Sequence, residues 1–389
     1  MLPLLQRYLI ENWSVLRLGA PPPRRLDFLV QATGIGKLCC YIFPNGAAEP
    51  RWVAKMRRSP VENDLLRREY VLINYLRESG SDYVRRTIPG PLVETCVAGH
   101  QLAIEPYLPG RAMDGLLANA GERTRELAAA YRDLALKWLL RCQRETPRVR
   151  SPLRDQQIDD YFLGPIARLR SSAALTDHES SYLDQVTRQV EGLRRLPLPL
   201  VFKHGDFQPG NILLRDNAPT VIDWEFGLPT ALPLLDVFGF LLRNHTRQQG
   251  REEMDGYLED YLLDFDTVFF GSGPITRQSA DQVARAVQAL DFDPDWVPVL
   301  FAMFIVNEAN KYDTLLRRRS ERGYLYLLRS RNQPLPRSYL DQLARQKNVW
   351  LLGHLVSQER RLAVADASPG GRQPARSATS AAGTGWGNG

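Results

Sequence analysis

One short stretch of the chain places acidic and amide side chains at a spacing that suits chemistry on a phosphate group. Residues 204–227 read HGDFQPGNILLRDNAPTVIDWEFG, with Asp206 first, Asn211 five positions later and Asp223 after two short apolar runs. A carboxylate and a carboxamide supply hard oxygen ligands without a full cage, which suits Mg²⁺ shared with the oxygens of a nucleoside triphosphate. Asp206 then remains to accept the proton of an attacking hydroxyl or to orient it. The spacing therefore favours metal-assisted phosphoryl transfer.

The same stretch predicts the local structure that would hold these residues together. Residues 211–214 (NILL) and 219–224 (PTVIDW) have the composition of strands, and the polar segment between them is typical of a turn. In such a hairpin, Asn211 and Asp223 lie at the same end. A Pro-Gly pair bends the loop before the first strand and brings Asp206 close. The alternative is a plain polar hairpin with solvated turn residues.

These motifs resemble the catalytic signature of the aminoglycoside phosphotransferase and choline kinase superfamily. Its members are relatives of protein kinases that phosphorylate small molecules. The resemblance rests on HGD at 204–206 with Asn211, followed by IDWE at 222–225. It implies that Asp206 is the catalytic base, that Asn211 binds Mg²⁺ and that Asp223 is the principal metal ligand.

The resemblance also implies residues that support this centre. His204 receives a structural role without proton transfer, and Asp236 matches an Asp that braces the catalytic loop from below. Lys55 follows an apolar triplet, as in the strand that supplies the lysine for the α and β phosphates. Glu69 lies in the predicted helix that follows and is placed to pair with Lys55. Glu62 is a second candidate for the partner of Lys55. The alternative is that Lys55 and Glu69 are both surface residues exposed to solvent.

A glycine-rich phosphate loop is only partly present. Gly34 and Gly36 fit the first two positions of GxGxxG, but Cys39 stands at the third. The segment also departs from a Walker A loop, because Gln31 replaces its first glycine and Leu38 replaces the Ser/Thr after the lysine. The segment is equally compatible with a loop that covers the nucleotide phosphates and with a plain hairpin turn.

A break at residues 103–110, AIEPYLPG, resembles the linker that binds adenine through main-chain groups in this superfamily. Glu105 and Tyr107 are the residues expected at the adenine edge. Their side chains have no assigned role beyond packing.

The predicted fold class is α+β, a two-lobed protein-kinase-like fold with a small antiparallel-sheet N-terminal lobe, one helix in that lobe, and a larger, mainly helical C-terminal lobe. Strands are expected at 27–33, 37–43, 51–56, 90–98 and 101–108, and a helix over 59–79. That helix would begin with Ser59 and Pro60 and bury Leu65, Leu66, Val71 with Leu72, and Leu76. Later helices are expected at 121–146, 179–195, 232–243, 251–265, 277–290, 296–318 and 337–362, with 204–227 as the one strand-rich interruption.

We accordingly predict a nucleotide-binding lobe over 1–107, a helical lobe with the catalytic loop and substrate site over 108–364, and a disordered tail over 365–389. The tail reads ADASPGGRQPARSATSAAGTGWGNG and has too little apolar surface to order itself.

Composition limits the classes of protein that fit. The chain has 389 residues, 44% of them hydrophobic, and a net charge of +6 from 50 basic and 44 acidic residues. The charges are mixed along the chain, which gives no argument for a nucleic-acid partner. Four irregularly spaced cysteines predict neither a disulfide framework nor a zinc site. The absence of a signal-peptide pattern and of a long apolar run predicts a cytoplasmic protein without a membrane partner.

Two functions follow from these observations. The first is a kinase that uses Mg²⁺ and ATP (or GTP) to phosphorylate a hydroxyl of a sugar-like, aminoglycoside or amino-alcohol substrate. The second is a nucleotide-binding pseudokinase that acts as a protein-partner module. Lys55, Asp206, Asn211 and Asp223 together favour the first, and the incomplete glycine loop favours the second.

The acceptor and the oligomeric state stay open. An acidic cluster of Asp291, Asp293 and Asp295 suits an aminated sugar, or a solvated helix start. The helix after it places Asn307, Glu308 and Lys311 on one face. Its aromatic residues, Trp296, Phe301 and Phe304, fit core packing better than a cage for a quaternary amine.

Overall fold

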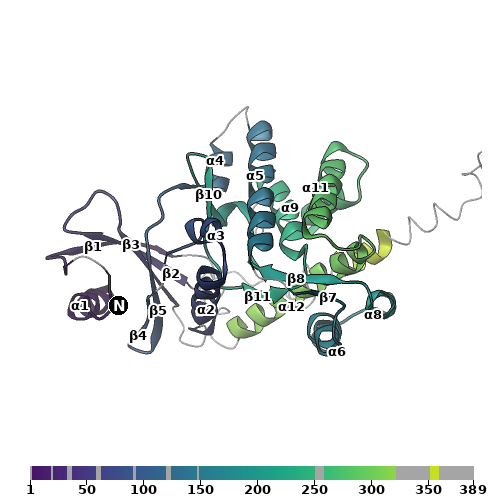
Figure 1. Ribbon diagram of the computed structural model, residues 1–389, viewed down its shortest axis with the longest axis horizontal. Coiled ribbons are helices and arrows are strands. Elements are labelled where there is room, and N and C mark those ends of the chain that lie inside the picture. Colours follow the sequence, from purple (N-terminus) through teal and green to yellow (C-terminus); the bar gives the residue numbers. More distant parts are fainter. Residues whose placement is uncertain are drawn as a thin grey trace, which may run out of the picture.

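The computed structural model describes residues 2–18, 21–32, 37–57, 63–90, 93–119, 124–146, 149–249, 258–320 and 351–358. A small antiparallel sheet forms the N-terminal part, and most of the helices form the remainder (Figure 1). The predicted α+β, two-lobed class is confirmed. The predicted tail over 365–389 lies outside the described residues. Among the described helices, none is long and apolar enough to cross a membrane.

The N-terminal sheet contains five strands in the order β1-β2-β3-β5-β4. They are β1 (Leu26–Ala32), β2 (Lys37–Pro44), β3 (Trp52–Arg57), β4 (Val93–Val97) and β5 (His100–Pro106). All neighbouring pairs in this sheet are antiparallel, as predicted.

Alternation along β3 separates an apolar face from a charged one. Trp52, Ala54 and Met56 belong to the hydrophobic cluster that includes helix α1 (Leu2–Glu11) and Trp13. Trp13 packs edge-on against Trp52, with ring centroids 4.9 Å apart. Because side chains alternate across a strand, Lys55 emerges on the opposite face. The strand thus directs a buried lysine away from the apolar cluster.

Helix α2 (Asn63–Ser79) contacts β3 and β5. It buries Leu65, Leu66, Leu72 and Leu76, and Glu69 among them. The predicted burial of Val71 is wrong, because this side chain is 54% exposed. Consecutive residues of a helix point about 100° apart, so burial of Leu72 turns its neighbour outward. The predicted cap at Ser59 and Pro60 lies outside the described residues.

The C-terminal part combines helices with two small three-stranded sheets, β10-β9-β6 and β11-β8-β7. Helix α3 (Asp82–Arg86) lies between α2 and β4 in the chain. The helical elements of the C-terminal part are α4 (Met113–Ala118), α5 (Thr124–Glu145), α6 (Asp155–Ile158), the π-helix η3 (Asp159–Leu163), α7 (Gly164–Ser172), α8 (Asp177–Leu193), the 3₁₀ turn η4 (Pro209–Asn211), α9 (Leu235–Gln248), α10 (Leu258–Phe269), α11 (Pro274–Leu290) and α12 (Trp296–Ser320). Its strands are β6 (Arg111–Ala112), β7 (Val149–Ser151), β8 (Leu198–Lys203), β9 (Ile212–Arg215), β10 (Ala218–Val221) and β11 (Leu228–Ala231). Residues 351–358 are also helical.

Two features of this part differ from the prediction. Residues 204–227 are not the one strand-rich interruption, because β7, β8 and β11 form a sheet of their own. Helix α4 and the helical segment from α6 to α7 were also not predicted. Strand β8 reads LPLVFK and is almost wholly buried. A short apolar run of this kind has no alternation that would distinguish a strand from a buried helix end.

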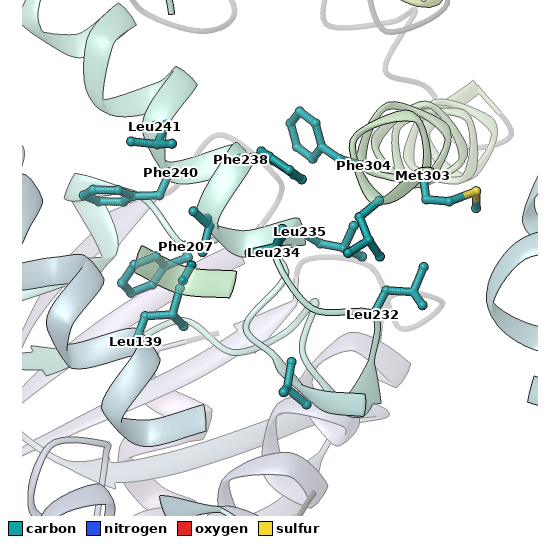
Figure 2. Close-up of a cluster of buried hydrophobic side chains, with 14 of the residues drawn as sticks. Leu139, Phe207, Leu232, Leu234, Leu235, Phe238, Phe240, Leu241, Met303 and Phe304 are labelled. Atoms are coloured by element: carbon teal, nitrogen blue, oxygen red, sulfur yellow. The ribbon is translucent and has the colours of Figure 1, made fainter. Parts of the chain in front are cut away.

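The core of the C-terminal part lies directly beneath the loop that contains Asp206. Figure 2 shows Phe207 between Leu139 and Phe240. Its ring stacks on Trp138, with centroids 5.7 Å apart, and lies 5.1 Å from Phe240. Since Phe207 is fully buried, the residue after Asp206 is fixed in close-packed surroundings, and the loop has a firm base.

Candidate active site

The predicted hairpin is present. Strands β9 and β10 pair with Val221 opposite Ile212. Asp216 and Asn217 form the turn with φ values of 49° and 59°, the left-handed conformation that two-residue hairpin turns need and that Asp and Asn tolerate. At the other end, Ile222 N donates to Asn211 O at 3.0 Å. The hairpin therefore places Asn211 beside the segment that ends in Asp223.

Asp206 and Asn211 are in direct contact. Asp206 Oδ2 accepts hydrogen bonds from Gln208 Nε2 at 2.9 Å and from Asn211 Nδ2 at 3.0 Å. Asn211 Nδ2 also donates to the main-chain oxygen of Asp206 at 2.9 Å. Asn211 thus uses its amide nitrogen to hold the loop, which leaves its side-chain oxygen as the atom suited to a ligand.

Asp236, at the start of α9, anchors the loop from below. Its carboxylate accepts from His204 N at 2.6 Å and from Gly205 N at 2.9 Å. Gly205 has φ of 79°, and an added Cβ would lie 2.2 Å from Phe226 O, so the turn has room only for glycine. This arrangement matches the bracing role predicted for Asp236.

The His204 ring is buried and held at both nitrogens. Asp206 N donates to Nδ1 at 3.2 Å, and Nε2 lies 3.0 Å from Ile222 O, so Nε2 has the proton. Burial lowers the pKa of His204, which keeps the ring neutral. A ring held in one tautomer by two main-chain groups ties the loop to the hairpin and is not free to transfer protons.

A lysine from α12 lies beside Asp206. Lys311 Nζ donates to Gly205 O at 2.8 Å and is 3.5 Å from Asp206 Oδ1. Burial by itself would raise the pKa of Asp206, but the positive charges of Lys311 and Arg243 outweigh it and hold the pKa well below its ordinary value. Arg243 in turn pairs with Glu308 at 2.7 Å. The sequence grouped Lys311 with Glu308 on one helix face but gave no sign of its contact with Asp206.

Asp223 adopts an uncommon backbone conformation, with φ of 69°. A non-glycine residue in this region is strained, and such strain is often found at functional sites. Its Oδ1 accepts a hydrogen bond from Lys37 Nζ, which also lies 3.5 Å from Glu225 Oε2. Burial would raise the pKa of Asp223, but Lys37 and Lys55 lower it, so the carboxylate is ionised.

Sequence reasoning missed Lys37, which it treated as part of a failed Walker A loop. In the β2-β3 register, Lys37 lies opposite Arg57 and Cys39 lies opposite Lys55. Residues directly opposite on paired strands share a face, so these side chains share the face of Lys55. The alternation of β2 and β3 was therefore the signal that could have identified Lys37.

Lys55 lies between two buried carboxylates. Its Nζ is 2.7 Å from Glu69 Oε1 and 3.0 Å from Glu105 Oε1. Glu69 Oε1 also accepts from Trp224 N at 3.4 Å, which connects α2 to the residue after Asp223. The structure thus brings Lys55 and Glu69 together, while the competitor Glu62 lies outside the described residues. Burial raises the pKa of Glu105 to about 7, against the charge of Lys55.

The predicted linker, residues 103–110, begins within β5 and continues past the end of that strand at Pro106. The Glu105 side chain does more than pack, because it pairs with Lys55. Tyr107 N donates to Arg51 O at 2.9 Å, so a ligand at Tyr107 would have to use its carbonyl oxygen. Gly34 and Gly36 lie outside the described residues.

The acidic cluster before α12 is far from Asp206. Asp295 precedes Lys311 by 16 positions, or about 24 Å along a helix axis, and Lys311 contacts Asp206. Asp291 instead pairs with Arg150, and Asp293 accepts from Asp295 N at 2.9 Å. The cluster is therefore a helix start and not part of a site around Asp206. The aromatic residues after it, Trp296 and Phe304, are buried in the core.

More than half of the chain resembles a known protein family. A family model, APH, described as "Phosphotransferase enzyme family", matches residues 43–270. No curated protein gives a significant match.

Three of the solved structures that resemble the chain are as follows. Amicoumacin kinase hAmiN, in complex with AMP-PNP, Ca²⁺ and Ami, has 11% identity and a TM-score of 0.45, covering 88% of this chain and 93% of the other. Aminoglycoside phosphotransferase APH(3'')-Id from Streptomyces rimosus ATCC10970 has 15% identity and a TM-score of 0.44, covering 79% of this chain and 98% of the other. A glucosamine kinase has 14% identity and a TM-score of 0.40, covering 92% of this chain and 99% of the other.

Proposed function

The chain belongs to the phosphotransferase enzyme family, and from that premise we propose that it uses Mg²⁺ to transfer the γ-phosphate of ATP (or GTP) to a hydroxyl of a small molecule. The acceptor classes that we propose are sugar-like compounds, aminoglycosides and amino alcohols. In this proposal Asp206 receives the acceptor proton, and Asn211 and Asp223 hold Mg²⁺. Lys55 contacts the α and β phosphates, oriented by Glu69.

One observation supports the proposal more than any other, namely the double role of Glu69. Its Oε1 accepts from Lys55 Nζ at 2.7 Å and from Trp224 N at 3.4 Å. A single buried carboxylate therefore links the lysine-bearing strand to the segment that contains Asp223. A nucleotide bound in this place would meet a cation for its phosphates and oxygen ligands for its metal together, as phosphoryl transfer requires.

The residues present fit Mg²⁺. Asn211 has its side-chain oxygen left over, because the amide nitrogen is engaged with Asp206. Asp223 has its second oxygen, Oδ2, beyond the Oδ1 that meets Lys37. Two such hard oxygen donors suit a cation that takes its remaining ligands from water and phosphate oxygens. Bound there, Mg²⁺ would neutralise charge that develops on the phosphates.

Asp206 would act chiefly by orientation. Lys311 and Arg243 keep its pKa low despite burial, so it is ionised and is a weak base. A weak base is adequate because the transferred group passes through a loose transition state, in which the hydroxyl proton leaves late. The hydrogen bonds from Gln208 and Asn211 hold Oδ2, so that Oδ1 faces the hydroxyl.

The test combines binding and turnover. Thermal shift would be measured with ATP, GTP and non-hydrolysable analogues, with and without Mg²⁺. Release of nucleoside diphosphate would then be screened against sugars, aminoglycosides and amino alcohols. We expect Mg²⁺-dependent stabilisation and release that depends on one acceptor class.

A matched pair of variants isolates the predicted base. Asp206→Asn should keep the nucleotide-induced stabilisation and lose at least about 100-fold in turnover. Asp216→Asn is the control, because its side chain is 95% exposed in the hairpin turn. Near-normal kcat in Asp206→Asn would contradict the role of the base. Stabilisation without release from any acceptor would favour the partner-module function, and no response to nucleotide would refute the proposal.

A further inference from the structure

We propose that Lys311 is the cation of the reaction centre on the acceptor side, where it positions Asp206 and stabilises the phosphoryl group during transfer. The inference rests on the proposed function and adds a residue that the sequence motifs do not contain. Helix α12, which supplies Lys311, runs from the far end of the C-terminal part toward the N-terminal sheet (Figure 1).

Four contacts hold the Lys311 ammonium in place. It donates to Gly205 O at 2.8 Å and lies 3.5 Å from Asp206 Oδ1, 4.0 Å from Glu308 Oε2 and 4.5 Å from the centre of the Phe226 ring. The side chain is 14% exposed. An ammonium held by a carbonyl, two carboxylates and an aromatic face has lost most of its freedom before any substrate binds, which is the preorganisation that electrostatic catalysis needs.

The hydrogen bonds of Asp206 place Lys311 next to the reacting atoms. Oδ2 is engaged by Gln208 and Asn211, so Oδ1 is the oxygen that would receive the acceptor proton. Lys311 lies at Oδ1. A hydroxyl in contact with that oxygen is therefore within a few ångströms of the ammonium, and so is the phosphoryl group that it attacks.

The catalytic loop contains no cation of its own, and Arg243, the other positive charge that acts on Asp206, is paired with Glu308 at 2.7 Å. The loop sequence from 204 to 211, HGDFQPGN, has neither lysine nor arginine, and its histidine is kept neutral by burial. The lysines of the N-terminal sheet are engaged elsewhere, Lys55 with Glu69 and Lys37 with Asp223. A phosphoryl group that moves toward the acceptor leaves those cations and needs one ahead of it.

The step balances without a change of charge on Lys311. The acceptor oxygen forms a bond to the γ-phosphorus while the bond from that phosphorus to the β-γ bridging oxygen breaks. The leaving nucleoside diphosphate keeps the electron pair, and the hydroxyl proton passes to Asp206 Oδ1. Lys311 remains an ammonium throughout and attracts the oxygens of the transferred group.

A purely structural role is the competing account, because Lys311 also holds Gly205 O. Lys311→Gln separates the two, since glutamine offers a donor to the carbonyl but has no charge. Lys311→Arg keeps the charge, and Lys137→Gln on the exposed face of α5 is the matched control. Each protein would be titrated with Mg²⁺ and ADP, alone and with aluminium tetrafluoride, an anion that takes the place of the transferred phosphoryl group. Mg²⁺-dependent hydrolysis of ATP without acceptor would be measured in parallel.

We expect Lys311→Gln to bind Mg²⁺ and ADP as the unsubstituted protein does. In this variant, the gain in affinity for ADP that aluminium tetrafluoride produces should be at least about tenfold smaller. The rate of ATP hydrolysis should fall about 100-fold, which is the effect of removing one preorganised electrostatic contact. Lys311→Arg should keep most of both, and Lys137→Gln should keep all.

Full retention of the fluoride complex and of hydrolysis in Lys311→Gln would overturn the proposal and leave only the bond to Gly205. If Lys311→Gln does not fold, Lys311→Arg decides, because a folded arginine variant without the fluoride complex contradicts a role for charge. An unsubstituted protein that binds no Mg²⁺ and ADP would refute the proposed function and this inference together, whereas an unaffected Lys311→Gln refutes this inference alone.

Discussion

The anchor of the catalytic loop offers a sharp test of how the site is built. Asp236 is buried and accepts hydrogen bonds from His204 N at 2.6 Å and Gly205 N at 2.9 Å. Asparagine has nearly the same shape but only one acceptor atom. In Asp236→Asn one of the two main-chain N–H groups would therefore face an amide N–H₂ and lose its partner.

The magnitude follows from these two bonds. Hydrogen bonds to a charged group contribute about 1.5–3 kcal/mol, and a buried donor without an acceptor costs about 1–3 kcal/mol. Loss of one bond, together with the weaker, uncharged bond that remains, should lower the free energy of unfolding by about 3 kcal/mol. Turnover should also fall by at least about tenfold, because Asp206 is displaced together with His204 and Gly205.

The assay is unfolding in urea or by heat, combined with Mg²⁺-dependent turnover of the same preparation. Asp184→Asn is the control, because Asp184 forms a surface ion pair with Arg170, with both side chains more than a third exposed. Such pairs contribute about 0–1 kcal/mol. A loss below about 0.5 kcal/mol in Asp236→Asn, with unchanged turnover, would refute the anchoring role.

Three further predictions test other parts of the site. Gly205→Ala should destabilise the protein and abolish turnover, because the added Cβ would lie 2.2 Å from Phe226 O at a residue with φ of 79°. The control is Gly192→Ala in α8, where a Cβ meets nothing within 4 Å and should stabilise the protein slightly; equal melting temperatures of the two variants would contradict the clash. Burial raises the pKa of Glu105 from 4.5 to about 7, so its contribution to stability is present below pH 4.5 and is lost as the pH rises through 7. The melting temperature of Glu105→Gln should lack this decline between pH 5 and pH 8, and parallel profiles would argue against a titrating Glu105. Asp223→Ala should abolish Mg²⁺-dependent nucleotide binding, and an unaltered Mg²⁺ dependence in a calorimetric titration would show that Asp223 is not the metal ligand.

Much of the site could be predicted because the information is local. The hairpin needs two short β-forming runs and a turn that tolerates a left-handed backbone, and Asp216 and Asn217 supply that turn. A hairpin of this kind necessarily brings Asn211 and the Asp223 segment to one end. The direction of Lys55 likewise follows from alternation along one strand.

Other features could not be predicted because they depend on contacts between distant segments. Lys37 meets Asp223 across 186 positions, and Lys311 meets Asp206 across 105. Propensity and periodicity describe neighbours in the chain and contain no information about which helix end lies over which loop. Strand β8 was missed and the exposure of Val71 was misjudged for the same reason, since both depend on the surface against which the element packs.

The sequence by itself thus determined the chemical groups and their local geometry, namely the carboxylate, the carboxamide, the turn between the strands and the lysine-bearing strand. Only the tertiary structure decided the electrostatic state of those groups. Asp206 and Asp223 are ionised although burial opposes it, because lysines from α12 and β2 lie against them. Coulombic attraction falls with distance in space and is independent of separation along the chain, so this part of the site exists only once the chain is folded.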